Sequence, residues 1–395
     1  MVGTRGVPAR YGGFETAIEE IGQRLVARGH RVTVYCRSNS DGDHPAPNDY
    51  LGMDLVALPA LRRKSLETLS HTALSAVRCR TASPSDAVLL FNAANACLLP
   101  TLRRRGVPVA VHVDGLEWQR AKWSGAGQRF YRWSESLAVR WADALIADAP
   151  GISDYYRTEF GATTEPLVYG APLLTDPADD RLGELDLTRD GFHLVVARFE
   201  PENHVEEIVQ GYRASAAQLP LVVVGGAPYS DRYTAAIEDA AGGDTRIRLI
   251  GPVWDQSQLD QLYAHALVYL HGHSVGGTNP SLLRAMGAGT AVGAWDVRFN
   301  HDVLDTGAWY FATPDGVRIA VEAAENDQTA TTTAGRNLRS RAQQLYDWDD
   351  VTDGYEALAR RLANGWSRRG ESSGRRTPHA TSLPGSSAPS ARSTR

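Results

Sequence analysis

Residues 267–289, LVYLHGHSVGGTNPSLLRAMGAG, join a short apolar run to a glycine-rich loop and the first turns of a helix. The run 267–270 has the length and composition of a buried strand. Pro280 suits the first helical turn, where its missing N–H would have no partner anyway. Strand, loop and helix in this order are typical of α/β proteins with parallel sheets.

The same alternation recurs along the chain, with helical stretches of about ten or more residues between many of the runs. The predicted strands form a first series at 31–36, 87–91, 107–113, 144–147 and 167–169, and a second at 193–197, 221–224, 247–250, 267–270 and 291–294. Runs this rich in Val, Ile, Leu and Ala indicate sheets buried on both faces. Two series predict an α/β fold of two doubly wound, Rossmann-like domains.

The ends of these domains have recognisable compositions. The stretch 170–190 is rich in Pro, Asp and Gly, so we expect a first domain at 1–170 and a second at 171–345. The tail 367–395 has almost no apolar content and is predicted to be disordered. Only Met1 and Val2 precede the first glycine-rich loop, so we expect either a start upstream of Met1, which we favour, or an abnormally short first strand.

Composition excludes several classes of protein. Residues 1–165 carry 20 basic against 17 acidic side chains, and residues 166–360 carry 14 against 28, which argues against a nucleic-acid-binding protein. Three scattered cysteines and no signal peptide or long apolar run favour a cytoplasmic protein. Basic clusters at 62–64 with Arg78 and Arg80, and at 103–105, are either solvated faces or peripheral contacts with the inner face of a membrane.

Two segments of the first domain are candidates for ligand binding. The loop GTRGVPARYGG ends in Gly12 and Gly13, opens a helix with Glu15 in its first turns, and is either an anion-binding loop or a tight turn. The segment HVDGLEWQRAKW follows a strand, where α/β proteins bind ligands. It crowds together the polar residues His112, Asp114, Glu117, Arg120 and Lys122, and its tryptophans, 118 and 123, would stack on a sugar or belong to the core.

The second domain offers two matching segments. In VVARFEPENH, Arg198 ends a strand and is suited to bidentate phosphate binding, or to an ion pair with Glu200 or Glu202. In the opening stretch, the residues Gly276, Gly277, Thr278 and Asn279 would cradle a diphosphate at the start of the helix. His271 and His273 have no accompanying carboxylate or cysteine, so no metal site is expected.

Together, GTRGVPARYGGFET, DGLEWQRAKW, ARFEPEN and HGHSVGGTNPSLL resemble the family-4 glycosyltransferases of the GT-B fold, over roughly residues 1–362. They are most similar to the bacterial rhamnosyltransferase-like subgroup of polysaccharide biosynthesis. The resemblance implies a nucleoside diphosphate sugar held mainly by the second domain and a glycan or lipid-linked acceptor bound by the first. It also implies a helix at 346–366 crossing back to the first domain, and retaining transfer of a hexose without metal or other cofactor.

The resemblance also implies roles for single residues. Arg198 matches the arginine that neutralises the donor diphosphate, and Asn203 stands where the family usually has a lysine. The glycines 12 and 13 match a loop near donor phosphates and acceptor, and residues 277–281, including Ser281, match the donor phosphate and sugar loop. The family's active-site histidine aligns either with His112 or with Asp114, and the sequence does not decide between these two alignments.

One position departs from the family. A pair of glutamates eight positions apart usually grips the nucleotide ribose, and here the two places hold Gly276 and Arg284. An arginine cannot accept a hydrogen bond from ribose, so Arg284 is expected to reach a phosphate or a carboxylate such as Glu117. Weaker donor binding or altered donor choice would follow.

Three hypotheses therefore stand at this point. The first is an active retaining hexosyltransferase, with rhamnose as one candidate sugar. The second is a catalytically silent binding subunit of a polysaccharide assembly complex, which the arginine at position 284 supports. The third is a nucleotide-sugar epimerase on the same fold, against which the first-domain loop with GGFET argues.

Overall fold

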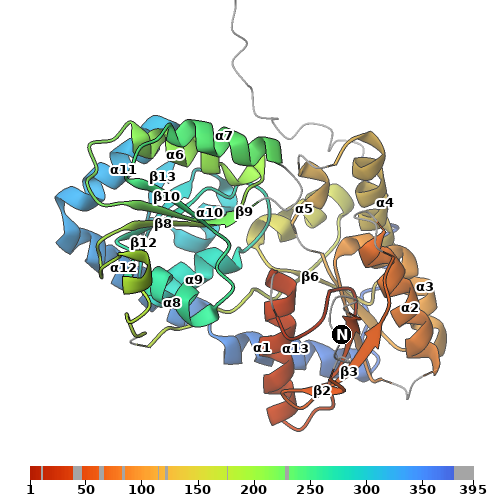
Figure 1. Cartoon of the computed structure of the whole chain (residues 1–395). Helices are drawn as coiled ribbons and strands as arrows, with labels where there is room; N and C mark the ends of the chain where they lie inside the picture. Colours follow the sequence, from red (N-terminus) through yellow and green to blue (C-terminus); the bar gives the residue numbers. More distant parts are fainter. Residues whose placement is uncertain are drawn as a thin grey trace, which may run out of the picture.

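The computed structural model describes residues 1–9, 12–38, 47–61, 66–81, 85–113, 115–120, 123–175, 177–226 and 231–377. It is an α/β structure whose parallel sheets lie in two Rossmann-like domains side by side (Figure 1). The predicted fold class is therefore confirmed.

The first domain contains two short sheets. One has the order β1-β3-β2, and the other runs β4-β5-β6-β7 with all strands parallel. The strands are β1 (Thr33–Arg37), β2 (Asp49–Tyr50), β3 (Met53–Leu58), β4 (Val88–Phe91), β5 (Val109–His112), β6 (Ala144–Ala147) and β7 (Glu165–Pro166). Met1 and Val2 lie between the two sheets. The backbone N–H of Tyr35 in β1 donates to the Met1 carbonyl over 3.1 Å, and Val2 forms a parallel bridge with Leu90 of β4. These two residues take the place of the central strand.

The helices of this domain begin with α1 (Gly13–Ala27), whose predicted apolar face is buried through Ile18, Ile21 and Leu25. Gly29, just beyond its end, has the positive φ that ends many helices. The remaining helices are α2 (Glu67–Thr81), η1 (Ala93–Leu98), α3 (Leu99–Leu102), η2 (Arg103–Arg105), η3 (Glu117–Gln119), α4 (Gly125–Trp141) and α5 (Pro150–Phe160), where η marks a 3-10 helix.

The second domain is built on one parallel sheet of order β10-β9-β8-β11-β12-β13. Its strands are β8 (His193–Arg198), β9 (Leu221–Gly226), β10 (Ile247–Gly251), β11 (Val268–His271), β12 (Ala291–Trp295) and β13 (Trp309–Phe311). Its helices are η4 (Gly183–Leu185), η5 (Pro201–Asn203), α6 (Val205–Arg213), α7 (Asp231–Ala241), α8 (Gln256–His265), α9 (Pro280–Ala288), α10 (Arg298–Leu304), α11 (Pro314–Asn326) and α12 (Gln328–Leu345). Helices α6, α7 and α11 cover one face of the sheet, and α8, α9 and α12 cover the other (Figure 1).

Nine of the ten predicted strands are present, with ends shifted by one or two residues. The prediction of a strand at 167–169 is wrong. The chain pairs with β6 only through Glu165–Pro166 and leaves the sheet edge after Leu167 N donates to the Ala147 carbonyl over 3.0 Å. The strands β2, β3 and β13 were not predicted, and two of them are too short to show a period.

The C-terminal part of the chain returns to the first domain. Helix α13 (Trp348–Ala363) packs against α1 (Figure 1), and its Tyr355 shares one buried cluster with Ile18 of α1 and Leu283 of α9. One core therefore links the two domains behind the crevice between them.

The expectation of disorder from residue 367 is wrong for 367–377. Arg368 is 2% exposed, and its guanidinium donates to the Val139 carbonyl over 2.8 Å. Arg376 lies between the buried carboxylates Glu135 and Glu159. The segment is ordered by these charged and backbone contacts rather than by apolar burial, which is why low hydrophobicity misled the prediction. Residues 378–395 lie outside the described residues.

Candidate active site

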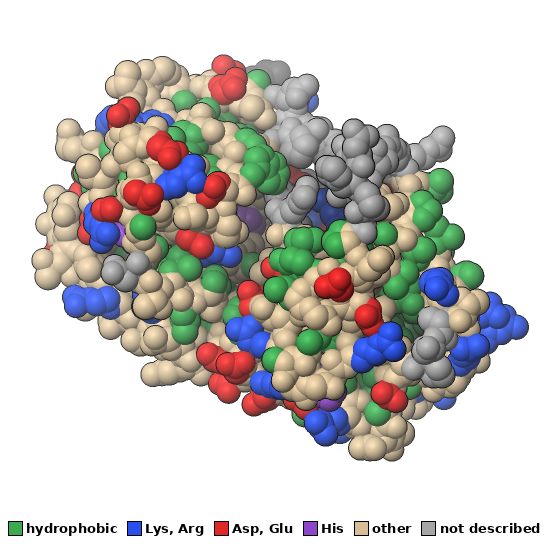
Figure 2. Space-filling model, turned by 60° about the horizontal axis from the view of Figure 1, so that its bottom comes forward, with side chains coloured by type: hydrophobic (Ala, Val, Ile, Leu, Met, Phe, Trp, Pro, Cys, Tyr) green, Lys and Arg blue, Asp and Glu red, His purple; other side chains and the backbone are tan. Residues whose placement is uncertain are grey.

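The carboxyl ends of β5 and β6 face those of β8 and β11 across a crevice. Figure 2 shows the surface hollowed where the two domains meet. The chains approach closely here, since a Cβ at Gly115 would lie 2.4 Å from the backbone Cα of Gly276, and one at Gly13 would lie 2.8 Å from the ring atom Cγ of Pro280. Only glycine fits such distances. The glycine-rich segments predicted separately in the two domains are therefore in direct contact.

The loop before α9 is fixed by its own polar groups. Asn279 caps the helix by accepting a 2.9 Å hydrogen bond from Ser281 N. Thr278 Oγ1 donates to the Asp148 carbonyl of the first domain over 2.5 Å, and Gly276 has a φ of 139°. The start of α9, with the positive end of its dipole, thus lies at the crevice, as an anion-binding loop requires.

Arg198 stands at the end of β8 with its side chain 36% exposed. Its Nη1 lies 3.5 Å from Glu200 Oε1, the ion pair that was the alternative to phosphate binding. Asn203 is buried and donates from Nδ2 to the Arg198 carbonyl over 2.8 Å. Its amide therefore holds the loop that carries Arg198 and does not extend into the crevice.

Arg120 of the first domain reaches the same loop. Its Nε lies 2.6 Å from Glu117 Oε2, while its Nη1 lies 3.7 Å from Glu202 Oε1 and 4.0 Å from Glu200 Oε2. The sequence placed Arg120 in a polar cluster but gave no sign that it crosses to the second domain.

His112 ends β5 in an aromatic cage. Its ring stacks on Phe91 and Tyr169 and meets the edge of Phe14, and neither ring nitrogen has a hydrogen-bond partner among the described residues. Burial lowers the pKa of His112 to about 3, so the ring is neutral at physiological pH. Asp114, the other candidate for this role, lies outside the described residues.

Asp148 is a candidate that the sequence reasoning missed. It follows β6, is 3% exposed, and leaves Oδ1 without a hydrogen-bond partner among the described residues. A Cβ at Gly277 would lie 2.2 Å from this oxygen, so the carboxyl abuts the loop before α9. Burial raises the pKa of Asp148 to about 7. Its position directly after the predicted strand 144–147, where α/β proteins bind ligands, could have marked it as a candidate from the sequence.

The two histidines at the end of β11 are neutral: His271, the last residue of the strand, is buried, and His273 is partly buried. The rings of His271 and His273 stack with centroids 4.4 Å apart, and Tyr269 Oη lies 3.2 Å from His271 Nδ1. Burial lowers the pKa of His271 to about 3 and holds that of His273 well below its usual value. Across the described part of the chain, no group of three His, Cys, Asp or Glu is arranged to hold a metal ion.

The expectations for Arg284 need correction. Its guanidinium pairs with Asp260 of α8, and not with Glu117. Asp260 also lines a cavity of about 420 Å³ between α8 and residues 173–175 and 177–178. Because 284 lies one turn into α9, its side chain points toward the neighbouring helix, which a linear sequence does not show.

Glu15 folds back on the first loop. Its Oε1 accepts a 3.0 Å hydrogen bond from Arg5 N, and a Cβ at Gly12 would lie 2.3 Å from its Oε2. The carboxylate thus stabilises the loop that carries the predicted acceptor or phosphate site.

The basic clusters lie on the first domain, away from the crevice. Arg80 and Arg105 line one small surface pocket, and Arg103 pairs with Asp143 over 2.9 Å. Residues 62–64 lie outside the described residues. No helix in the described ranges is long and apolar enough to cross a membrane.

Two family models match the chain in succession. The glycosyl transferase 4-like domain matches residues 12–170, and the glycosyl transferases group 1 domain matches residues 184–338. Together they span both sheets and every segment of the crevice. The chain is a member of the glycosyltransferases. A search of curated proteins found no match.

Solved structures support the fold of this glycosyltransferase. Sucrose-phosphate synthase from Thermosynechococcus elongatus has a TM-score of 0.77 at 20% identity, covering 91% of this chain and 95% of the other. HepE from Anabaena, in complex with UDP-glucose, has a TM-score of 0.71 at 15% identity, with coverages of 90% and 98%. The UDP-forming α,α-trehalose-phosphate synthase from Burkholderia xenovorans, in complex with glucose-6-phosphate, has a TM-score of 0.70 at 12% identity, with coverages of 91% and 99%. The likeness confirms the GT-B fold.

Proposed function

We propose that this glycosyltransferase moves a hexose, with rhamnose a candidate, from a nucleoside diphosphate sugar to a glycan or lipid-linked glycan. The observation that carries the proposal is that Arg198 and the loop before α9 follow the paired strands β8 and β11, and that Ser274 N donates to the Glu202 carbonyl over 3.0 Å between the two segments. A guanidinium and a helix N-terminus together suit a diphosphate. The similar structures that hold UDP-glucose and glucose-6-phosphate support a donor and an acceptor site in this fold.

The proposed chemistry needs charge stabilisation more than a protein nucleophile. The bond between the anomeric carbon and the diphosphate oxygen breaks, and the acceptor oxygen bonds to that carbon on the same face. Because the new bond forms on the face that the diphosphate leaves, the configuration is retained. The acceptor proton passes to the departing diphosphate, and the step needs no metal. Arg198, the loop amides and the dipole of α9 stabilise the negative charge on the leaving group.

The first domain supplies the other partner. In this proposal the acceptor lies near Gly12 and Gly13, and His112 or Asp114 orients the donor sugar. A neutral His112 suits this role, because it can donate one hydrogen bond and accept another without charge. Its ring nitrogens have no hydrogen-bond partner among the described residues, and in this proposal a bound sugar supplies one.

Calorimetry with a panel of nucleoside diphosphate sugars tests the proposal. We expect one donor to bind the full chain and to be hydrolysed slowly without acceptor. Arg198→Ala should weaken binding of that donor at least tenfold, which is about 1.4 kcal/mol. Arg318→Ala is the matched control, since Arg318 forms ion pairs on α11 with Asp315 and Glu322. Absence of binding to every donor would contradict the proposal.

A silent binding subunit is the second candidate, and the Arg284–Asp260 pair favours it. With Arg284 held by Asp260, the start of α9 offers no carboxylate to ribose hydroxyls. A variant Arg284→Glu that gains donor hydrolysis absent from the wild-type chain would support a silent subunit. Turnover by the wild-type chain would exclude it.

A further inference from the structure

Glu200 lies between two arginines that belong to different domains. Its Oε1 is 3.5 Å from Arg198 Nη1 in the second domain, and its Oε2 is 4.0 Å from Arg120 Nη1 in the first. The side chain is 28% exposed, and Oε2 has no hydrogen-bond partner among the described residues. Neither contact is short, so the carboxylate is shared between the arginines and fully held by neither.

The cluster carries an excess of negative charge. Three carboxylates, those of Glu117, Glu200 and Glu202, surround the guanidinium groups of Arg120 and Arg198. The neighbouring His273 does not compensate at neutral pH, because burial and nearby cations hold its pKa well below the usual value. An anion at Arg198 would therefore meet repulsion unless Glu200 moves away.

Glu200 is the carboxylate of this cluster that has room to move. Glu202 has less room, since its side chain is only 6% exposed and its backbone is fixed by 3.0 Å hydrogen bonds from Ser274 N and Oγ to its carbonyl. Glu117 is bound to Arg120 over 2.6 Å. A shift of Glu200 toward Arg120 would shorten a 4.0 Å contact and leave Arg198 open.

We propose that Glu200 is a positioning residue that exchanges partners, leaving Arg198 for Arg120 when the donor diphosphate binds, and so couples donor occupancy to contact between the domains. The inference rests on the proposed function, because it takes Arg198 as the diphosphate ligand. Arg120 then acts on donor affinity without touching the donor. Coupling of this kind is reciprocal, so whatever strengthens the pair of Glu200 and Arg120 also favours the donor.

The exchange predicts opposite signs for two single variants. Glu200→Gln removes the competitor of the diphosphate, and donor affinity should rise about fivefold, at the lower end of such couplings. Arg120→Gln removes the alternative partner and returns Glu200 to Arg198, so affinity should fall about fivefold. In the double variant the loss caused by Arg120→Gln should vanish, because no carboxylate remains to compete. Arg120→Lys should restore most of the affinity, because it restores the charge.

The test is a double-mutant cycle on the full chain, measured by calorimetry at low salt. UDP, dTDP, GDP and ADP serve as probes, and the tightest binder of the wild type is used throughout. Donor hydrolysis gives KM and kcat as a second readout, with the changes expected in KM. Thermal unfolding confirms that each variant is folded, and a variant that fails to fold is replaced by Arg120→Met or Glu200→Ala, which also remove the charge.

Each result bears on a distinct claim. An equal loss from Arg120→Gln in both backgrounds, or weaker binding by Glu200→Gln, would overturn the exchange. If Arg198→Ala weakens binding while the cycle is additive, the proposed function stands and this inference fails. If no nucleoside diphosphate binds the wild type, or Arg198→Ala binds as well as the wild type, both fail.

Discussion

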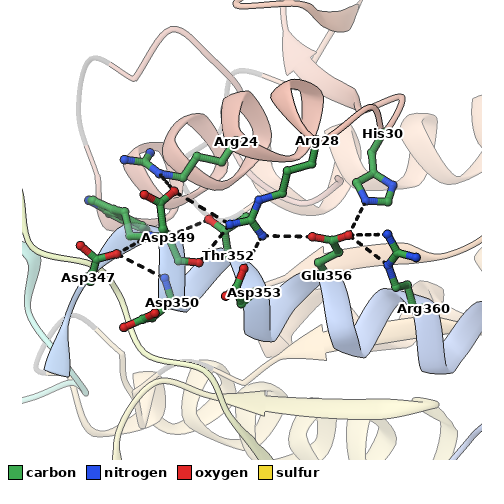
Figure 3. Close-up of polar contacts among 11 residues, drawn as sticks. Arg24, Arg28, His30, Asp347, Asp349, Asp350, Thr352, Asp353, Glu356 and Arg360 are labelled. Atoms are coloured by element: carbon green, nitrogen blue, oxygen red, sulfur yellow. Dashed lines mark hydrogen bonds and ion pairs between the residues drawn. The ribbon is translucent and has the colours of Figure 1, made fainter. Parts of the chain in front are cut away.

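Two of the contacts around the first domain differ in what they are made of: its contact with the C-terminal helix α13, and its contact with the second domain at the crevice. Behind the crevice, α1 and α13 face each other through ion pairs (Figure 3). Arg24 pairs with Asp349, and Arg28 pairs with Asp353 and Glu356, the latter at 3.0 Å. Nearly every charge there has a partner and faces solvent. Such pairs are individually weak and tolerate substitution.

At the crevice the contact consists of glycine backbone and incompletely paired carboxyl groups. Gly115 meets Gly276, and the buried carboxyl of Asp148 abuts Gly277. Buried polar atoms without partners cost stability, so a fold keeps them where a ligand or a conformational change uses them. The difference indicates that the α1–α13 contact anchors the C-terminal helix on the first domain, while the contact at the crevice serves ligand binding.

Gly115→Ala should have the largest effect. Its Cβ would lie 2.4 Å from Gly276 Cα, and because the obstacle is backbone, the domains must separate at the crevice. A displacement near 1 Å typically costs about 100-fold in rate, and we expect a loss of that size in donor turnover with little change in melting temperature. Gly125→Ala is the control, since nothing lies within 4 Å of its Cβ. Wild-type turnover by Gly115→Ala would show that the close contact at the crevice is not needed for activity.

Asp148→Asn should change how stability depends on pH. The pKa of Asp148 is raised from 3.8 to about 7, so the native state binds a proton that the unfolded state has released between these values. The wild type therefore loses stability as pH rises through this window, by at most about 1.4 kcal/mol per pH unit. Chemical denaturation at several pH values should show a shallower decline for Asp148→Asn. Parallel curves would mean that the carboxyl is already ionised.

Arg28→Ala tests the other contact. Its guanidinium is 26% exposed and its partner Asp353 is 69% exposed, so solvent screens the pair. We expect a loss of roughly 0.5–1 kcal/mol in the free energy of unfolding, decreasing with added salt, and unchanged donor affinity. Arg360→Ala, which also loses a pair with Glu356, is the matched control on α13. A loss of donor affinity would show that the α1–α13 contact also contributes to donor binding.

Glu356→Gln should lower stability at neutral pH and have no effect in strong acid. His30, Arg360 and Arg28 hold the pKa of Glu356 down at about 2, below its usual 4.5. A lowered carboxyl pKa contributes stability that is present above 4.5 and is lost as pH falls through about 2. The melting temperatures of the wild type and Glu356→Gln should therefore converge in acid. A constant difference down to pH 2 would contradict this assignment.

The sequence predicted local structure well where burial of apolar side chains was the main source of stability. Apolar runs marked nine of the strands, because parallel strands buried on both faces have almost no polar positions. It failed where stability came from contacts distant in the chain. The segment 367–377 looked unstructured, yet Arg376 is ordered by Glu135 and Glu159, more than two hundred residues away in the chain.

By itself, the sequence determined the fold class, the glycine-rich loops at the strand ends and the placing of Arg198 at one of them. These features depend on residue type and spacing within a few turns of chain. Only the tertiary structure decided which groups meet from distant parts of the chain: Arg284 with Asp260, Asp148 with Gly277, and Glu200 with Arg120 of the other domain. Each of these pairings joins segments separated by more than twenty residues, and no local pattern in the sequence records which distant groups will lie close in space.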